Sequence, residues 1–259
     1  MKDKVIVITG STSGIGLGIA KNFAKAGSSI VINGFPGQEP VDQIKTELIE
    51  LGAKDIFYHP ADLSKPQEID DMFDKIVSQF SWVDVLVNNA GVQFVSKIEE
   101  FPPEKWENII RIDLIAAFYT TRRVIPLMKK NRWGRVINIA SAHALAASPF
   151  KSAYVAAKHG ILGMTKSVAL EVAEEGITVN AICPGYVKTL LVLNQVADTA
   201  KARGISEEDV IKKVMLGPQA TKKFVEIEEV AELAMFLCSD KARSITGTGL
   251  SIDGGWTAQ

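Results

Sequence analysis

Short runs of apolar residues alternate along the chain with longer stretches in which apolar and polar residues recur at helical spacing. Short β-rich apolar runs predict buried strands, and a period of about 3.6 residues predicts amphipathic helices. The seven strands expected from this pattern are residues 4–9, 29–33, 55–58, 84–88, 135–141, 178–182 and 250–252. The helices expected between them include residues 16–26, 39–51, 66–80, 104–130 and 153–175.

Strands that alternate with crossover helices predict a parallel sheet with helices on both faces. The expected fold class is therefore α/β, a single doubly wound Rossmann-type domain over residues 1–259 with a seven-stranded parallel sheet. No repeat or Pro/Ser-rich linker marks a second domain. Residues 189–225, which are rich in Lys and Ala, follow the sixth expected strand, and we interpret them as a helical lid insertion.

Composition narrows the class of partner. A net charge of −1 in 259 residues gives no electrostatic reason to expect nucleic acid or an anionic membrane, and it favours a small-molecule ligand. Cys183 and Cys238 stand far apart in apolar surroundings, so we interpret both as packing residues and expect neither a disulfide nor a metal site. With no leader segment and no apolar run of about 18 residues, we expect a soluble cytoplasmic protein.

A glycine-rich turn, residues 9–16, follows the first expected strand and opens the first helix. Its glycines are Gly10, Gly14 and Gly16. Glycines at such a junction let the backbone approach a pyrophosphate, while the helix N-terminus supplies N–H groups and a positive dipole end. The alternative is a tight turn without a ligand. The spacing Gly-x-x-x-Gly-x-Gly differs from the Gly-x-Gly-x-x-Gly of other dinucleotide-binding domains, and this difference is diagnostic.

Tyr154 and Lys158 stand four residues apart in an expected helix, and Ser141 ends the fifth expected strand. One helical turn puts the phenol and the ammonium on one face, where the positive charge can lower the pKa of the tyrosine. The serine hydroxyl can then hold a substrate oxygen. The alternative is an ordinary Tyr/Lys pair on a solvated helix face. These three residues form a candidate proton-transfer site.

Five motifs stand in an order and spacing typical of one enzyme family. They are residues 9–16, residues 88–91, Ser141, Tyr154 with Lys158, and residues 184–185. On these motifs the chain resembles the short-chain dehydrogenase/reductase family over essentially its whole length. The resemblance implies a doubly wound domain assembled as a homotetramer, with no metal. It also implies that Tyr154 is the general acid/base, that Lys158 lowers its pKa and holds the nicotinamide ribose, and that Ser141 hydrogen-bonds the substrate oxygen.

One position departs from the family pattern. The family places a fourth catalytic residue, an Asn, in the helix before the serine strand, and this chain has Asp113 there. In the family the backbone carbonyl of that Asn helps to hold a water in a proton relay to the lysine. An Asp can keep that role while changing the side-chain contacts, so we expect Asp113 to be catalytic and the enzyme to be active. The alternative is a non-catalytic, nucleotide-binding scaffold.

The resemblance also implies the contacts of a nicotinamide dinucleotide. They are Gly10, Thr12, Ser13, Gly14, Ile15, Gly16, Phe35, Asp62, Leu63, Asn89, Ala90, Gly91, Tyr154, Lys158, Pro184, Gly185, Val187 and Thr189. NADP-specific relatives usually carry Arg or Lys after the second strand or at the position of Ser13, where it pairs with the 2′-phosphate. Neither place is basic here, so NAD is expected. Phe35 is expected against the adenine or, alternatively, in the core.

A closer resemblance concerns the segments around the candidate proton-transfer site. Residues 89–93, 140–143, 151–154, 191–195 and 253–257 look like those of the bacterial D-3-hydroxybutyrate dehydrogenases of that family. This resemblance implies that, beside Ser141 and Tyr154, the substrate is bound by Gln93, His143, Lys151 and Gln195. One cation with several neutral donors suits the carboxylate of a short hydroxy acid.

Each of these side chains has a structural alternative. His143 would be a satisfied structural histidine, Lys151 a surface lysine, and the two glutamines would face water. Trp256 is interpreted as a packing or subunit-contact residue.

The expected reaction is the reversible, NAD-dependent oxidation of (R)-3-hydroxybutyrate to acetoacetate. The partner is thus a small hydroxy or keto acid, over which residues 189–225 would close. The nearer rival is an NADPH-dependent reductase of β-ketoacyl thioesters. That enzyme requires basic residues at the phosphate turn and a pocket without a carboxylate clamp.

Overall fold

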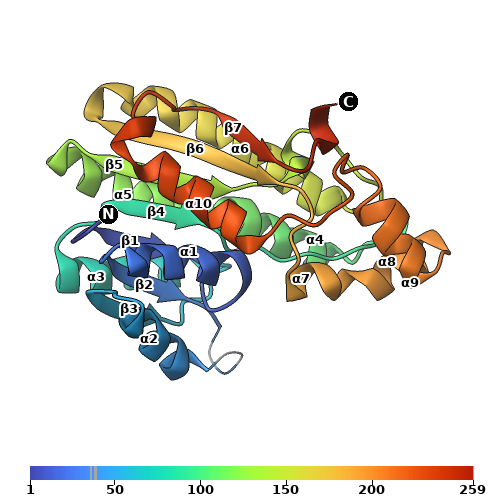
Figure 1. The fold of residues 1–259 in the computed structure, drawn as a ribbon, viewed down its shortest axis with the longest axis horizontal. Helices are drawn as coiled ribbons and strands as arrows, with labels where there is room; N and C mark the ends of the chain where they lie inside the picture. The colour runs from blue at the N-terminus through green and yellow to red at the C-terminus, as the bar shows by residue number, and fades with distance from the viewer. Residues whose placement is uncertain (36, 38–39, 259) are drawn as a thin grey trace.

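Seven parallel strands form one sheet in the order β3-β2-β1-β4-β5-β6-β7 (Figure 1). The computed structural model describes residues 1–35, 37 and 40–258. The strands are β1 (Val5–Ile8), β2 (Ser29–Asn33), β3 (Asp55–His59), β4 (Val85–Asn88), β5 (Gly134–Ile139), β6 (Ile177–Pro184) and β7 (Gly249–Ile252). Every expected strand is present with bounds within two residues of those expected, so the doubly wound fold class is confirmed.

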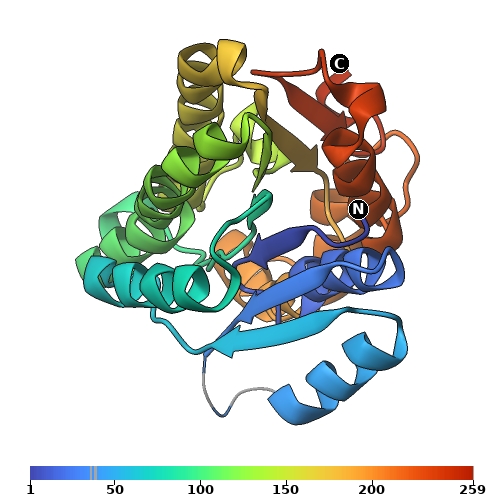
Figure 2. The ribbon, with the colours of Figure 1, turned by 90° about the vertical axis from the view of Figure 1, so that its left-hand side faces the viewer.

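Helices cover both faces of the sheet, with α3, α5 and α6 on one side and α1 and α10 on the other (Figure 2). The helices are α1 (Gly14–Lys25), α2 (Val41–Glu50), α3 (Pro66–Phe80), α4 (Pro103–Ile110), α5 (Ala116–Asn131), α6 (Ser152–Val172), α7 (Leu190–Leu193), α8 (Gln195–Arg203), α9 (Glu207–Asp209) and α10 (Ile227–Cys238). Residue 39, where the second helix was expected to begin, lies outside the described residues. Within the described part of the chain, no helix is long and apolar enough to cross a membrane.

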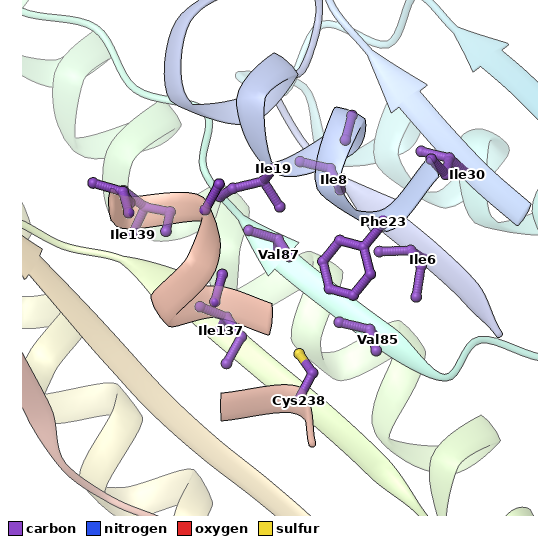
Figure 3. Packing of buried hydrophobic residues seen from close by; sticks show 14 of the residues in the cluster. Ile6, Ile8, Ile19, Phe23, Ile30, Val85, Val87, Ile137, Ile139 and Cys238 are labelled. Atoms are coloured by element: carbon purple, nitrogen blue, oxygen red, sulfur yellow. The ribbon is translucent and has the colours of Figure 1, made fainter. Parts of the chain in front are cut away.

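Successive residues of a strand pack into two different hydrophobic cores, because side chains alternate between the faces of a sheet. Ile6 and Ile8 of β1 pack with Phe23 of α1 and Cys238 of α10 in one core (Figure 3). Val7 belongs to the other core, against α3 and α5. These strands are buried on both sides, which explains why they appear in the sequence as continuous apolar runs.

The stretch expected as one helix, residues 104–130, consists of three segments. Helix α4 continues into a π-helical segment, Arg111–Ile115, which is followed by α5. A π-helical turn holds an extra residue and changes the direction of the side chains that follow, and such turns are frequent at functional sites. Asp113 is the middle residue of this segment, and it is buried.

The insertion after β6 is helical and lies beyond the carboxyl ends of the strands (Figure 1). It contains α7, α8, α9 and a second π-helical segment, Val210–Met215. A parallel β-bridge between Val187 and Val225 joins the two ends of the insertion. Val196, Val210 and Met215 of the insertion form a small apolar cluster with Tyr186, which precedes the insertion. The expected helical insertion is therefore present, and it is held at its base.

Candidate active site

The strand order reverses between β1 and β4, and open α/β sheets bind their ligands at the carboxyl ends of the strands beside such a point. Asn88 at the end of β4 donates to Asn138 Oδ1 (2.8 Å) and accepts from Thr120 Oγ1 (2.6 Å). Asn138 in turn donates to Thr165 Oγ1 of α6 (2.8 Å). These buried hydrogen bonds fix α5 and α6 onto the strand ends, and so fix the functional side chains that these helices carry.

The turn after β1 offers its backbone to a ligand. Gly10 and Gly14 have φ angles of +59° and +54°, a region that glycine adopts without steric cost. A Cβ atom at Gly16 would lie 2.5 Å both from Asn89 Nδ2 and from the carbonyl oxygen of Gly10. Helix α1 begins at Gly14 with no acidic residue in its first turn, so no nearby carboxylate on this helix opposes an anion at its N–H groups. This cradle fits a pyrophosphate.

Residues expected on other parts of the cofactor lie against the same turn. Asn89 Nδ2 donates to the carbonyl oxygens of Thr9 (2.9 Å) and Gly10 (2.8 Å). Thr9 Oγ1 accepts the backbone N–H groups of Asn89 (3.0 Å) and Ala90 (3.1 Å). The methyl group of Thr189, at the start of the insertion, lies 3.6 Å from the position that a Cβ of Gly14 would take.

We expect Gly16→Ala to raise the Kd for NAD by about 10- to 100-fold, because the added methyl group forces the turn and Asn89 apart at a cost of roughly 1–3 kcal/mol. Binding is measured by isothermal titration calorimetry. Gly163→Ala on α6 is the matched control, since a Cβ there meets nothing within 4 Å. Unchanged NAD affinity in Gly16→Ala would remove the turn from the cofactor site.

The end of β2 carries no cation. Asn33 Oδ1 accepts the N–H of Gly10 (3.2 Å), and its Nδ2 donates to the carbonyl oxygens of His59 and Ala61 (both 3.0 Å). Asn33 therefore ties the turn after β1 to the end of β3. Phe35 is 41% exposed, so the alternative that it is a core aromatic is wrong.

Asp62 and Leu63, expected near the adenine, follow β3. Asp62 Oδ1 accepts hydrogen bonds from the hydroxyl (2.7 Å) and the N–H (3.0 Å) of Ser64. Although burial acts to raise the pKa of Asp62, these bonds and the charge of Lys65 lower it. The carboxylate thus fixes the turn before α3, and Leu63 is buried.

Pro184, Gly185 and Val187 lead from β6 into the insertion. A Cβ at Gly185 would lie 2.4 Å from Gln219 Oε1, and that oxygen accepts the N–H of Tyr186 at 2.6 Å. The far end of the insertion is thus packed directly against the exit of β6.

Ser141, Tyr154 and Lys158 come together from β5 and α6. Lys158 is buried, and its Nζ lies 5.3 Å from the centre of the Tyr154 ring and donates to the carbonyl oxygen of Ile139 (3.1 Å). The Ser141 side chain acts on the phenol of Tyr154 and lowers its pKa. Ser141 was expected as the last residue of a strand, but β5 ends at Ile139 and Ser141 instead caps the short 3₁₀ turn that follows, accepting the N–H of His143 (3.1 Å).

The pKa of Tyr154 is raised from its ordinary value. Burial is the largest cause, and the charge of Asp113 adds to it, whereas Lys158 and the hydrogen bond from Ser141 lower the pKa. The effect of Lys158 has the predicted sign. The net direction is upward, because desolvation of the phenolate outweighs the attraction of one ammonium.

Asp113 lies against Lys158 with no exposed side-chain surface. Its Oδ1 accepts the N–H of Val92 (2.8 Å), and its Oδ2 lies 3.3 Å from Lys158 Nζ. Burial raises the pKa of Asp113, and Lys158 opposes this shift. Although burial acts to lower the pKa of Lys158, Asp113 and Tyr154 raise it. A cavity of about 10 Å³ adjoins Asp113, Lys158 and Asn88, enough space for one water molecule.

Lys151 is 5% exposed, so the surface-lysine alternative is wrong. Its Nζ donates to Tyr186 Oη (3.3 Å) and to Gln195 Oε1 (3.2 Å). Burial and the charge of Arg203 lower the pKa of Lys151 to about 8. Among the residues that the structure describes, no carboxylate lies within 4.0 Å of this ammonium. Gln195, at the start of α8, therefore joins the insertion to a buried cation that has no anionic partner.

Both ring nitrogens of His143 face hydroxyl groups. Nδ1 lies 3.3 Å from Ser141 Oγ, and Nε2 lies 2.9 Å from Ser148 Oγ. Burial, with a smaller effect from Lys151, lowers the pKa of His143 to about 3, so the ring is neutral at working pH. His143 thus has the hydrogen bonds of a satisfied structural histidine, while its contact with Ser141 places it at the candidate proton-transfer site.

Gln93 follows the loop that carries Asn89 and Gly91. Its side-chain oxygen and nitrogen are both buried and have no hydrogen-bond partner within the protein. The alternative that Gln93 faces water is therefore wrong. An unpaired buried amide costs roughly 1–3 kcal/mol, which a polar ligand group in contact with it would recover.

Two aromatic residues lie beside these side chains, Tyr186, which was not found from the sequence, and Trp256, which was interpreted as a packing or subunit-contact residue. The rings of Tyr186 and Trp256 are stacked at 5.5 Å with 5° between their planes, and Trp256 meets the His143 ring edge-on at 4.9 Å. Both stand shortly after a strand end, β6 or β7, at the edge where parallel sheets bind ligands. That position was the available signal. Trp256 does pack, as interpreted, but against a candidate substrate residue.

Comparison with known proteins agrees with this geometry. The family model described as Enoyl-(Acyl carrier protein) reductase matches residues 10–257. A D-beta-hydroxybutyrate dehydrogenase of Rhizobium meliloti (strain 1021) is 59% identical over 256 residues, which are 99% of this chain and 99% of the relative. This chain belongs to the short-chain dehydrogenase/reductase family. The resemblance inferred from the motifs is thereby confirmed.

Two further members of the short-chain dehydrogenase/reductase family extend the comparison. A D-beta-hydroxybutyrate dehydrogenase of Cupriavidus necator (strain ATCC 17699) is 50% identical over 260 residues, with 100% of both chains covered. The solved structure of a single-substitution variant of actinorhodin polyketide ketoreductase with NADPH has a TM-score of 0.93 at 31% identity, again over 100% of both chains. The family consists of oxidoreductases that bind a nicotinamide dinucleotide.

Proposed function

We propose that this protein interconverts (R)-3-hydroxybutyrate and acetoacetate with NAD as the cofactor. Two relatives named D-beta-hydroxybutyrate dehydrogenase, at 59% and 50% identity over essentially full lengths, support this substrate. The relative solved with NADPH, a polyketide ketoreductase, is 31% identical.

The observation that carries the proposal is the buried ammonium of Lys151. A buried cation without a counter-ion is costly, and a bound carboxylate removes that cost through charge-assisted hydrogen bonds. Tyr186 and Gln195 already orient the ammonium. The rings of His143 and Tyr154 lie 5.8 Å apart, and those of His143 and Tyr186 lie 6.3 Å apart, so contacts join the cation to the proton-transfer residues. This group of side chains therefore suits a short acid that carries a hydroxyl group as well as a carboxylate.

In the oxidation, Tyr154 takes the proton of the substrate hydroxyl, while Ser141 hydrogen-bonds the same oxygen and holds it in place. Lys158 stabilises the phenolate charge on Tyr154, and Asp113 holds Lys158. Lys151, with Gln195, Gln93 and His143, would bind the carboxylate. The turn at residues 9–16, with Asn89 and Thr189, would hold the dinucleotide, which when bound would supply the acceptor or donor of the hydride.

The preference for NAD rests on the end of β2 and on the phosphate turn. A 2′-phosphate is usually paired with Arg or Lys, and here the corresponding positions are Ser13 and residues 33–35. Phe35 is exposed at this place and can lie against an adenine ring.

The test is an absorbance assay of the purified protein with NAD or NADP and (R)-3-hydroxybutyrate or its methyl ester, and with NADPH and a β-ketoacyl thioester. We expect turnover with NAD and the free acid, and a large loss with the ester, since the ester cannot pair with Lys151. Turnover of a β-ketoacyl thioester with NADPH but none of the acid would favour the reductase. Inactivity on both the free acid and the thioester, in a protein that binds NAD, would favour the scaffold alternative.

Assembly and location are proposed on the family resemblance. We propose a homotetramer located in the cytoplasm. Apolar side chains are exposed on α5 and α6, at Phe118 (50%) and Leu170 (82%), and contacts between subunits would cover them. Light scattering after size-exclusion chromatography measures the subunit number directly.

A further inference from the structure

Asp113 places a carboxyl group beside the ammonium of Lys158 in the candidate proton-transfer site. Its side chain has no exposed surface, and its Oδ2 lies 3.3 Å from the ammonium of Lys158. That ammonium lies 5.3 Å from the Tyr154 ring. One buried cation therefore lies between two groups that can be negative, the carboxylate of Asp113 and the phenolate of Tyr154.

The other titratable groups that face Tyr154 and Lys158 add no charge at neutral pH. Facing Tyr154 and Lys158 are the neutral His143 and the Cys183 thiol on β6, whose pKa burial raises to about 11. Tyr186 also interacts with Tyr154, and burial raises its pKa to about 12. Asp113 is thus the one carboxyl group among the described groups that act on Tyr154 or Lys158.

We propose that the side chain of Asp113 is a buried counter-ion of Lys158 that keeps Tyr154 protonated at neutral pH, so that the site is set to donate a proton to a ketone. With Asp113 and Lys158 both charged, the pair is neutral and a protonated Tyr154 adds no charge. Losing the phenolic proton would leave two anions around one ammonium in a desolvated site. With an amide at position 113, the phenolate and the ammonium would form a neutral pair.

This inference deepens the proposed function by assigning the direction that the site favours at neutral pH. In reduction, the hydride goes to the ketone carbon, and the phenolic proton of Tyr154 goes to the ketone oxygen. In oxidation, Tyr154 must first lose its proton to solvent, and Asp113 makes that loss harder. Asp113 acts through Lys158, so it is a positioning residue and does not itself touch the substrate.

A purely structural role for Asp113 would give a different result. Its Oδ1 accepts the N–H of Val92 and so anchors the loop before Gln93. Asp113→Asn keeps the size of the side chain and this acceptor, and it removes only the charge. Loss of an anchor would alter stability, whereas loss of a counter-ion alters the pH at which Tyr154 titrates.

The experiment follows the titration of Tyr154 by NMR in protein labelled with ¹³C at the tyrosine ring carbon that bears the hydroxyl, with Tyr154→Phe used for assignment. We expect a midpoint above 10 in the natural protein and a midpoint lower by about one to two pH units in Asp113→Asn. The acidic limb of kcat/KM for oxidation should move down by the same amount, so that oxidation at pH 7 rises about tenfold or more. Reduction at pH 7 should not rise with it.

Glu107→Gln is the matched control, since this exposed carboxylate on α4 changes the net charge equally and should leave the Tyr154 midpoint in place. Equal Tyr154 midpoints in the natural protein and in Asp113→Asn would overturn the inference. A Tyr154 midpoint below 10 in the natural protein would also overturn it, and that measurement does not depend on the folding of a variant. The NMR titrations need no substrate. A protein inactive on (R)-3-hydroxybutyrate would therefore refute the proposed function and still leave this inference to be decided.

Discussion

Replacing Tyr154 by phenylalanine is expected to lower kcat for (R)-3-hydroxybutyrate oxidation by about 10²- to 10⁴-fold, the usual contribution of a positioned general acid/base. The change removes one oxygen atom and keeps the ring that contacts His143 and Lys158. The Kd for NAD should change little, because the turn at residues 9–16 is untouched. Initial rates are measured from the absorbance of the reduced cofactor, and NAD binding is measured by calorimetry.

Tyr119→Phe on α5 is the control for loss of a phenol elsewhere, and it should retain the natural rate. The result that contradicts the proposed mechanism is a Tyr154→Phe protein with kcat within tenfold of the natural value. Another group would then have to take the substrate proton.

Replacing Lys151 by methionine is expected to raise KM for (R)-3-hydroxybutyrate by about 10- to 150-fold, since hydrogen bonds to a charged group contribute about 1.5–3 kcal/mol. Methionine keeps the length of an unbranched side chain in this buried place. The chemical step should be less affected, because Lys151 donates its hydrogen bonds to Tyr186 and Gln195, and its connection to Tyr154 runs through the rings of Tyr186 and His143. Steady-state kinetics separate the two parameters, and Lys166→Met on the exposed face of α6 is the control.

The pKa of Lys151 predicts that the affinity for the acid depends on pH. The pKa of Lys151 is lowered to about 8, so in the protein without substrate the ammonium is present below pH 8 and is lost as pH rises through that value. Affinity for the acid should then fall about tenfold per pH unit above 8, while Lys151→Met should lack this limb. A KM that is the same for both proteins from pH 7 to pH 10 would exclude Lys151 as the carboxylate ligand.

The fold was predictable because its signals are local. Strands such as β1, buried on both faces, must be apolar throughout, and the crossover helices must carry an apolar face. The interruption of residues 104–130 by a π-helical segment was not predictable, because the apolar period changes there by only one residue. The bridge between Val187 and Val225 also depends on an approach of distant segments that no local pattern records.

The residues of the candidate site also fall into two groups, those that local motifs predict and those that depend on the approach of distant segments. Residues expected from motifs, such as Ser141, Tyr154 and Lys158, lie together because short segments at strand ends and one helix turn position them. The stacking of Trp256 on Tyr186 joins the ends of two strands, and sequence spacing does not reveal it. The net pKa shift of Tyr154 depends on burial as well as on the neighbouring charge, and spacing predicted only the effect of Lys158.

The β-bridge at the base of the insertion bears on how new substrate ranges can arise in this fold. Val187 and Val225 lie side by side, so the chain leaves the sheet and returns to it at one place. Val196, Val210 and Met215 of the intervening segment also pack together in a small apolar cluster with Tyr186. The length and sequence of segment 188–224 can therefore change through recombination or design, while the sheet and the glycine-rich turn at residues 9–16 keep their shape.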